Sequence, residues 1–281
     1  MRVETAQHAG FCFGVERAVS LVEALLKEGT APLYTYGPII HNEEVIQNLK
    51  SRGVTVIEDL EKLGDYAPGT LVIRSHGISR REQALLEAAG FRLVDATCPF
   101  VKKIHHLAEE AEEAGRTVFV IGDPDHSEVK AILGWCRNEA YVIRNEGDIP
   151  DLDPAQPISV LAQTTHQPAK FQEMLAKIKN RYYNAIAVNT ICNATQIRQQ
   201  ETRELAQAAD AMIVIGGLSS SNTRKLVEIC EAHCSKTYYI RTLKDLQDQG
   251  FQPVRYVGIT AGASTPKNII EEVQNFVGSK F

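Results

Sequence analysis

The feature that most limits how this chain can fold is the repeated alternation of apolar, strand-like runs with helical stretches. Runs such as LYTYG, TVFVIG and AMIVIGG are separated by amphipathic segments such as EEVIQNLKSRG along the whole sequence. This order is typical of parallel sheets, because two parallel strands need a long crossover that a helix usually supplies. The sequence therefore predicts an α/β protein.

Three segments of the chain repeat the same order of strand, glycine, short polar loop, helix and strand. A cysteine at a predicted strand-to-helix junction precedes each loop glycine, at separations of 25, 24 and 24 residues. The three pairs are Cys12 and Gly37, Cys98 and Gly122, and Cys192 and Gly216. The matched spacing predicts three related modules.

We place these modules at residues 1–97, 98–191 and 192–281, with one of the three cysteines in each. Ligands of open parallel sheets bind at the carboxyl ends of the strands. Modules packed around a pseudo-threefold axis would bring the three cysteines together at that edge. A single cysteine is more often a small buried apolar residue than a ligand, but three at equivalent positions predict a metal site.

Three thiolates without a fourth leave the chemistry of such a site open. Thiolates select zinc, copper(I) or iron–sulfur clusters, and three protein ligands leave one position vacant, as in catalytic zinc sites. A cubane cluster is normally held by four cysteines, so three would leave one iron accessible to a substrate. A zinc hydrolase and a non-enzymatic cluster sensor are the alternatives to a redox enzyme.

The other cysteines, Cys136, Cys230 and Cys234, form no C-x-x-C pair, so a zinc ribbon is not indicated. We expect all three to be packing residues.

Polar side chains follow several predicted strands and suggest an anionic ligand. Imidazoles, hydroxyl groups and helix amino termini together fit a diphosphate, and neither nucleotide motif, G-x-x-x-x-G-K-[ST] or G-x-G-x-x-G, is present. The alternative is that the serines and the asparagine are ordinary helix caps and the histidines are solvated. The candidate residues are His41, His76, His126, Ser220, Ser221, Asn222 and Ser264.

Glu128 follows His126 by two residues at the end of the same loop. It could donate a proton to a leaving hydroxyl group, or it could be an acidic residue of a first helical turn with no chemical role.

Composition limits the partners. The net charge of −5 at pH 7 argues against nucleic acid, and no apolar run reaches the roughly 20 residues that a membrane helix needs. Residues 1–20 do not have the pattern of a signal peptide, and the cysteine spacing does not suggest disulfides. We therefore predict a cytoplasmic protein that binds neither nucleic acid nor membrane.

Motifs along nearly the whole chain resemble those of the 4-hydroxy-3-methylbut-2-enyl diphosphate reductase family. The motifs are GFCFGVERA, GPIIHN, RSHG, DATCPFV, DHSEV, QTT, NTICNATQIRQ, SSSNT and TAGASTP. The resemblance implies three α/β modules around a [4Fe–4S] cluster that is held by Cys12, Cys98 and Cys192, with the fourth iron open to the substrate.

The resemblance also assigns the remaining site residues. The histidines, serines and asparagine named above match the diphosphate-binding positions, Thr164 matches a substrate-contacting threonine beside Thr165, and Glu128 matches the acid that relays protons. The implied reaction removes the allylic hydroxyl group with two electrons and two protons. It yields isopentenyl and dimethylallyl diphosphate, in the last step of the methylerythritol phosphate pathway.

No flavin or nicotinamide motif is present, so the resemblance implies reduced ferredoxin or flavodoxin as the electron donor. Two positions depart from the family pattern, Ser127 in place of proline and Ala162 in place of threonine. Neither departure removes a ligand.

Overall fold

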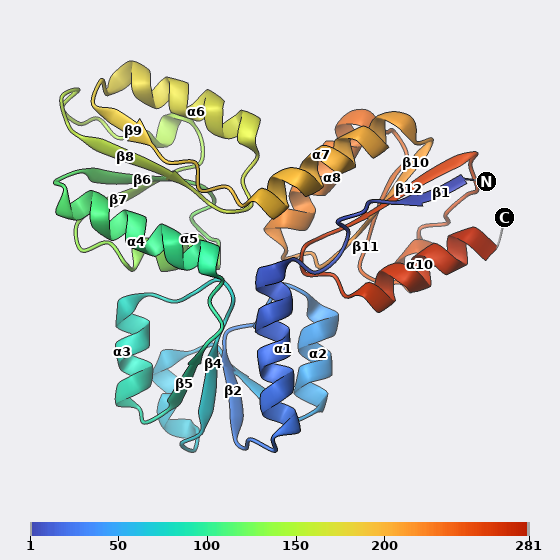
Figure 1. Cartoon of the computed structure of the whole chain (residues 1–281), viewed down its shortest axis with the longest axis horizontal. Helices are drawn as coiled ribbons and strands as arrows, with labels where there is room; N and C mark the ends of the chain where they lie inside the picture. Colours follow the sequence, from blue (N-terminus) through green and yellow to red (C-terminus); the bar gives the residue numbers. More distant parts are fainter. Residues whose placement is uncertain (1, 280–281) are drawn as a thin grey trace. The chain divides into compact units, whose positions relative to one another are not determined.

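The computed structural model describes residues 2–279, and its strands form parallel four-stranded sheets (Figure 1). The first sheet has the order β3-β2-β4-β5, with β2 (Leu33–Tyr36), β3 (Val54–Ile57), β4 (Thr70–Ile73) and β5 (Arg92–Asp95). The second has the order β7-β6-β8-β9, with β6 (Thr117–Ile121), β7 (Ala140–Ile143), β8 (Ile158–Ala162) and β9 (Ala185–Ala187). The third has the order β11-β10-β12-β1, with β1 (Arg2–Thr5), β10 (Ala211–Ile215), β11 (Thr237–Ile240) and β12 (Tyr256–Ala261).

The three sheets repeat one strand order, which confirms the predicted α/β class with three related modules. The boundary at the amino end is different from the prediction. Strand β1 pairs in parallel with β12, with Val3 opposite Val257, so the first residues belong to the third sheet and not to a module at 1–97. Sequence order alone did not reveal this pairing, because a short edge strand can join any free sheet edge. The other boundaries stay predictions.

Helices connect the strands. They are α1 (Phe13–Lys27), α2 (Glu43–Ser51), α3 (Arg80–Ala88), α4 (Pro99–Glu113), α5 (Ser127–Leu133), α6 (Pro168–Arg181), α7 (Asn193–Ala208), α8 (Ser221–His233), α9 (Leu243–Asp248) and α10 (Lys267–Ser279), with 3₁₀ turns η1 (Leu60–Asp65) and η2 (Glu146–Asp148). Local sequence sets several starts: Ser79 and Glu82 form a capping box before α3, and Pro99 opens α4.

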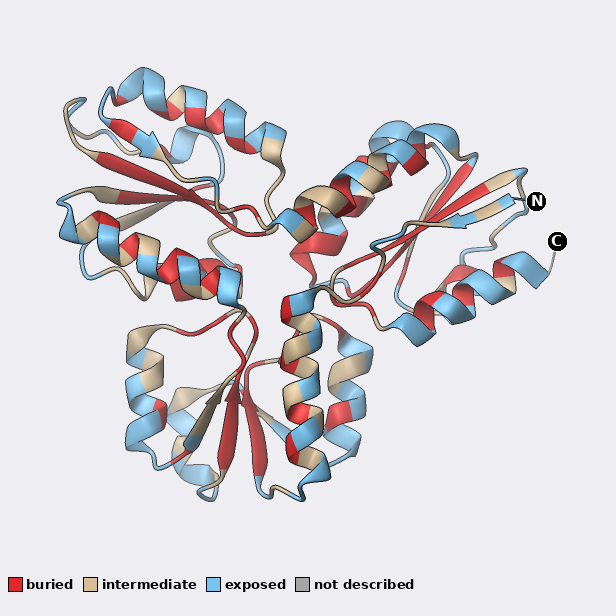
Figure 2. Ribbon diagram, in the orientation of Figure 1, coloured by how far each residue is buried: buried red, intermediate tan, exposed pale blue. Residues whose placement is uncertain are grey.

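The inner strands β2, β4, β8 and β10 are buried along their whole length (Figure 2). Strands of parallel sheets are buried on both faces because the crossover helices cover them, which explains the continuous apolar runs in the sequence. The predicted site residues lie at the strand ends and in the loops that follow.

The chain divides into two compact units. The terminal unit contains Met1–Glu16, His41–Gln47 and Asn193–Phe281, and therefore the third sheet. The central unit contains Arg17–Ile40 and Asn48–Cys192, and therefore the first and second sheets.

Each of the three predicted ligand cysteines follows the last strand of a sheet's order. Cys98 follows β5, Cys192 follows β9 and Cys12 follows β1, and each directly precedes a helix. The helix after Cys98, α4, packs on β6 and β8 of the second sheet, and the helix after Cys192, α7, packs on β12 of the third. Cys98 and Cys192 therefore mark the points where the chain passes from one sheet to the next.

Candidate functional site

The backbone of each of these cysteines makes the same hydrogen bond. In every case the cysteine N–H donates to a carbonyl oxygen in the polar loop that follows the third strand of the order. The bonds join Cys12 to Ala263 (3.1 Å), Cys98 to Ser75 (2.9 Å) and Cys192 to Thr164 (3.0 Å). The repeated bond ties each thiol-bearing junction to a loop that carries a predicted ligand-binding residue.

The three thiol-bearing residues are partly exposed, and each stands at the amino end of a helix. The Cys12 carbonyl accepts from the N–H of Glu16 (2.9 Å), and the Cys98 carbonyl accepts from the N–H of Lys102 (3.0 Å). A helix amino terminus stabilises a thiolate relative to a thiol. These positions suit metal ligation.

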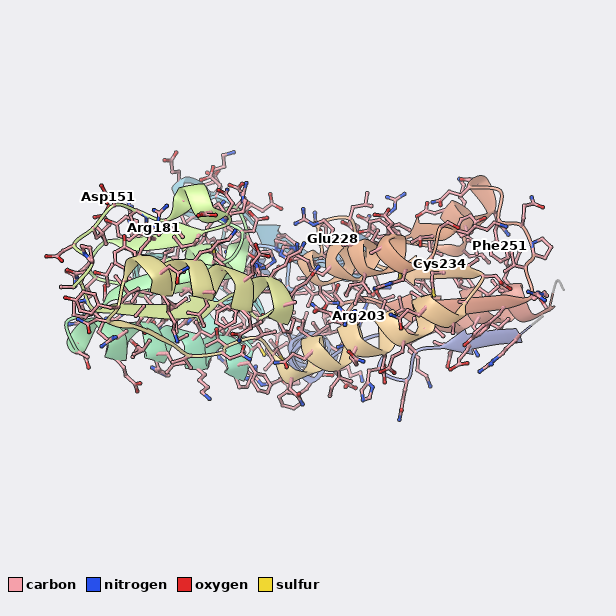
Figure 3. All side chains as sticks on the ribbon, turned by 90° about the horizontal axis from the view of Figure 1, so that it is seen from above. Asp151, Arg181, Arg203, Glu228, Cys234 and Phe251 are labelled. Carbon is pink, nitrogen blue, oxygen red and sulfur yellow. The ribbon has the colours of Figure 1, made fainter. Side chains whose placement is uncertain are left out.

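The remaining cysteines are packing residues, as predicted: Cys230 and Cys234 lie in the apolar core, and Cys136 packs, partly buried, against it. Burial raises the pKa of Cys136 and of Cys230 to about 12 in each case. Cys234, labelled in Figure 3, is buried, and its thiol donates to the carbonyl oxygens of Ala209 (3.6 Å) and Lys236 (3.7 Å). The raised pKa values keep the Cys136 and Cys230 thiols neutral, and neutral thiols are poor metal ligands.

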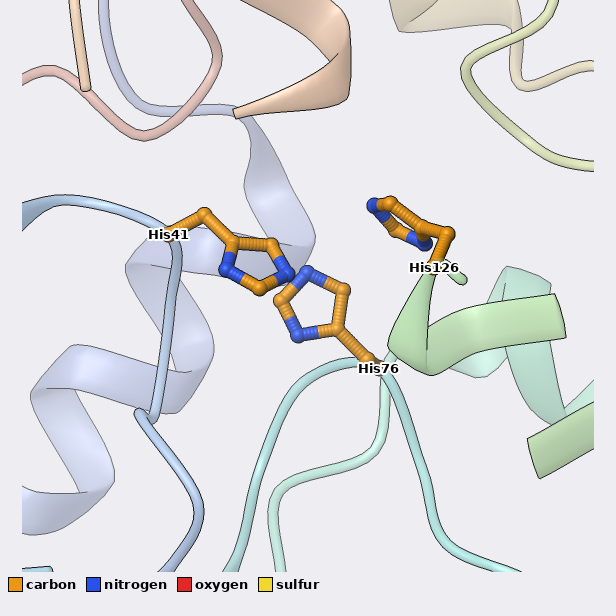
Figure 4. A group of neighbouring side chains, drawn as sticks. All are labelled: His41, His76 and His126. Carbon is orange, nitrogen blue, oxygen red and sulfur yellow. The ribbon is translucent and has the colours of Figure 1, made fainter. Parts of the chain in front are cut away.

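Two of the predicted histidines meet in the central unit. The rings of His76 and His126 lie edge to face, with centroids 5.5 Å apart (Figure 4, which also draws His41 of the terminal unit). His126 caps α5, and its Nδ1 accepts the N–H of Glu128 at 3.2 Å. This bond makes Nδ1 the acceptor, so the neutral ring carries its proton on Nε2 and can donate to an anion.

The loop that carries His76 is held by residues of the second module. Gly77 adopts a φ of +74°, and a Cβ there would lie 2.8 Å from Cε1 of His105, so only glycine fits. The His105 ring stacks on Trp135 at 5.1 Å, and Trp135 Nε1 donates to the carbonyl of Ile78 at 2.8 Å. Burial lowers the pKa of His105 to about 4, which makes this ring neutral at pH 7.

Glu128 is buried and bonded to Thr164 through both carboxylate oxygens. The Thr164 N–H donates to Oε1 and the Thr164 hydroxyl donates to Oε2, both at 2.6 Å. Burial raises the pKa of Glu128 above the usual value of glutamate, although both hydrogen bonds act in the opposite direction. The carbonyl oxygen of Thr164 accepts the N–H of Cys192, so Thr164 is bonded both to the acid and to a cysteine junction.

The β10–α8 loop of the terminal unit contains both a helix cap and unsatisfied polar atoms. Ser220 caps α8 by accepting the N–H of Thr223 at 3.2 Å, as the ordinary capping alternative predicts. Asn222 is only 4% exposed, and neither its amide oxygen nor its amide nitrogen has a hydrogen-bond partner among residues 2–279. Such atoms are costly to bury unless a ligand pairs with them.

The loop that carries His41 is bonded to this same unit. Ser264 Oγ donates to the His41 carbonyl at 2.8 Å, and Ser219 Oγ donates to Glu43 at 3.1 Å. Gly217 has no room for a side chain, because a Cβ would lie 2.6 Å from the Glu43 carboxylate. His41, Ser264 and the Ser219–Asn222 loop therefore belong to one packed group.

Of the helices within residues 2–279, none combines the length and the apolar character that crossing a membrane requires.

A family model described as LytB protein matches residues 3–278 of the chain. The chain belongs to the LytB family. A 4-hydroxy-3-methylbut-2-enyl diphosphate reductase of Alkaliphilus oremlandii (strain OhILAs) is 42% identical over 275 residues, which cover 97% of this chain and 98% of the relative. The reductase of the same name from Aquifex aeolicus (strain VF5) is 41% identical, over 96% of this chain and 93% of the relative.

Solved structures agree with this membership. The structure of (E)-4-hydroxy-3-methyl-but-2-enyl diphosphate reductase, the terminal enzyme of the non-mevalonate pathway, is 39% identical with a TM-score of 0.73, and 99% of each chain is covered. The structure of E-1-hydroxy-2-methyl-but-2-enyl-4-diphosphate reductase from Plasmodium falciparum is 28% identical with a TM-score of 0.93, over 99% of this chain and 88% of that chain. The family predicted from the motifs is confirmed.

Within this LytB-family chain, sequence motifs missed residues that hold the predicted site residues in place. Gln163 is buried, its Oε1 accepts the Asp123 N–H at 3.0 Å, and its Nε2 donates to the Thr165 hydroxyl at 2.9 Å. Trp135 and Glu43 likewise bond to loops far from them in sequence, through Ile78 and Ser219 respectively. The position of Gln163 directly before the two threonines was a sequence signal for its role. Trp135 and Glu43 had no such signal, because their contacts depend on how distant segments pack.

Proposed function

We propose that this chain is a 4-hydroxy-3-methylbut-2-enyl diphosphate reductase, which removes the hydroxyl group of that substrate to give isopentenyl and dimethylallyl diphosphate. Relatives about 40% identical over nearly the whole chain have this activity in their names. The geometric observation that carries the proposal is the buried Glu128, bonded to the threonine that also binds Cys192. A proton donor beside a thiolate site is what reductive loss of a hydroxyl group needs.

The three junction cysteines, Cys12, Cys98 and Cys192, are proposed to hold a [4Fe–4S] cluster. Their repeated backbone bonds and their places at helix amino ends fit this cofactor, whereas Cys230 and Cys234 are buried and Cys136 is packed, partly buried, against a core cluster. When bound, a cluster with one iron free of protein ligands supplies single electrons and a Lewis-acidic position. Three ligands are consistent with that open iron.

The diphosphate is proposed to bind the imidazoles of His41, His76 and His126 and the polar group of the terminal unit. The unsatisfied amide of Asn222 can both donate to and accept from a ligand. The amino terminus of α8, with Ser220 and Ser221, favours an anion. Binding the remote diphosphate there would orient the hydroxyl end of the substrate, close to Thr164 and Thr165.

Glu128 is proposed to protonate the leaving hydroxyl group. Its burial favours the protonated acid, which is the form that a proton donor requires. The net reaction takes up two electrons and two protons and releases the hydroxyl group as water. Because the sequence has no flavin or nicotinamide motif, reduced ferredoxin or flavodoxin is the proposed electron donor.

A cytoplasmic location is also proposed. The spacing of the six cysteines does not suggest a disulfide framework, as is usual for proteins of reducing compartments.

The assay that tests the function uses anaerobically purified protein, the allylic diphosphate and a chemically reduced viologen. We expect both isoprenoid diphosphates as products and a protein that contains iron and acid-labile sulfide. Zinc without sulfide would instead favour the hydrolase alternative. An iron-containing protein that leaves the substrate unchanged would contradict the reductase assignment.

A further inference from the structure

Arg198 of α7 is a buried cation that connects two cysteine-bearing segments. Arg198 is only 4% exposed. One guanidinium nitrogen donates to the carbonyl of Gly10 at 2.6 Å, and another donates to the carbonyl of Ala194 at 3.2 Å. All three residues belong to the terminal unit, and the bond to Gly10 spans 188 positions of sequence.

Both acceptors lie two residues from a predicted cluster ligand. Gly10 precedes Cys12, and Ala194 follows Cys192. Two residues of extended chain span at most about 7 Å, so within the terminal unit the guanidinium group holds the Cys12 segment against the start of α7. It thereby links the loop between β1 and α1 to the first turn of α7.

The direction of the Gly10 carbonyl is restricted by its backbone. Gly10 adopts a φ of +100°, a conformation that side-chain-bearing residues rarely adopt. A Cβ at this position would lie 3.0 Å from Cδ1 of Ile270 and 3.3 Å from the Thr265 carbonyl. The glycine therefore permits the close approach that Arg198 uses.

A buried positive charge acts strongly on charges near it, because little water is present to screen it. A cluster held by thiolates becomes more negative when it accepts an electron. A fixed cation beside the Cys12 segment and the first turn of α7 would stabilise the reduced form relative to the oxidised form, and net charge near a cluster is one of the factors that set its potential.

We propose that Arg198 is a positioning residue that holds the Cys12 segment against the start of α7 and raises the reduction potential of the cluster. The inference rests on the proposed cluster and assigns to the chain a residue that sets how easily this cluster is reduced. Arginine suits both tasks, because its planar fork can bond two carbonyls while it remains charged.

The test is a potentiometric titration of the anaerobic holoenzyme, followed by electron paramagnetic resonance, for three variants. Arg198→Gln removes the charge but retains donors, and Arg198→Lys retains the charge. Arg203→Gln removes a charge from the same helix, where Arg203 makes an exposed bond to Gln200 (3.3 Å; labelled in Figure 3).

We expect Arg198→Gln to lower the equilibrium constant for one-electron reduction about tenfold, a shift of about 59 mV to more negative potential. Arg198→Lys and Arg203→Gln should stay close to the wild-type potential. An Arg198→Gln protein with its iron and an unchanged potential would overturn the proposal. So would an equal shift in Arg203→Gln, because the effect would then not depend on the buried site.

If Arg198→Gln does not retain iron, Arg198→Lys decides the matter. Retained iron with a potential near the wild-type value supports the proposal, and a lysine variant as deficient as the glutamine variant overturns it. Absence of iron and sulfide from the wild-type protein would instead contradict the proposed cofactor, so the two failures are distinguishable.

Discussion

At the scale of single residues, the site depends on polar groups that the fold buries. Glu128 has both oxygens bonded to Thr164, which is 36 positions away, and Asn222 is buried with its amide unsatisfied among residues 2–279. The motifs predicted which residue types stand at the strand ends. They could not predict burial or partners, because these depend on contacts between distant segments.

Replacing Glu128 by glutamine removes a transferable proton and keeps the shape of the side chain. We expect turnover to fall about 10²–10⁴-fold, the usual contribution of a general acid, with unchanged iron content. The matched control is Glu113→Gln on the exposed side of α4, which should leave turnover unchanged. Anaerobic rate assays with iron analysis check this, and full activity of Glu128→Gln would remove Glu128 from its proposed role.

The same substitution should change how stability depends on pH. Burial raises the pKa of Glu128 in the folded state. The protonated side chain therefore contributes fully to the free energy of unfolding below the unfolded-state pKa of about 4.3, and this contribution is lost as pH rises toward the folded-state pKa. The free energy of unfolding of the wild type should therefore fall by about 1.4 kcal/mol, relative to that of Glu128→Gln, for each pH unit in that interval. Urea unfolding across pH measures this, and a pH-independent difference would contradict the raised pKa.

At the scale of elements, α5 connects the two histidines of the central unit. His126 at its amino end lies against His76, and Trp135 beyond its carboxyl end donates to Ile78 in the His76 loop. Residues at both ends of the helix therefore contact the loop that carries His76. The sequence predicted a helix after this loop but not that His126 caps it, and the tryptophan bond depends on packing between the first and second modules.

Removing that bond should loosen the His76 loop without touching the substrate's hydroxyl end. Trp135→Phe keeps an aromatic ring but loses the N–H donor, and one hydrogen bond contributes up to about 1.5 kcal/mol. We expect KM and the inhibition constant of inorganic diphosphate to rise up to about tenfold, with kcat nearly unchanged. Tyr183→Phe, at a site 72% exposed, is the control. A fall in kcat alone would contradict this role of Trp135.

At the scale of the whole molecule, one strand order occurs three times, and each time a cysteine follows its last strand. The spacing of cysteines and glycines predicted this repeat correctly. The pairing of β1 with β12 was not predictable, because the short run RVET has no distinctive apolar pattern and joins a strand from the other end of the chain. Strand β1 therefore completes the third sheet and Cys12 follows it, although both precede the first sheet in sequence.

Whether Cys12, Cys98 and Cys192 share one cluster is tested most directly by the iron and acid-labile sulfide content of the six single cysteine-to-alanine variants. Wild-type protein purified without oxygen should contain about four irons and four sulfides per chain. Replacing any of these three cysteines should abolish or sharply reduce both, whereas replacing Cys136, Cys230 or Cys234 should preserve them. A cluster that survives loss of one of the first three, or disappears with one of the last three, would contradict the assignment.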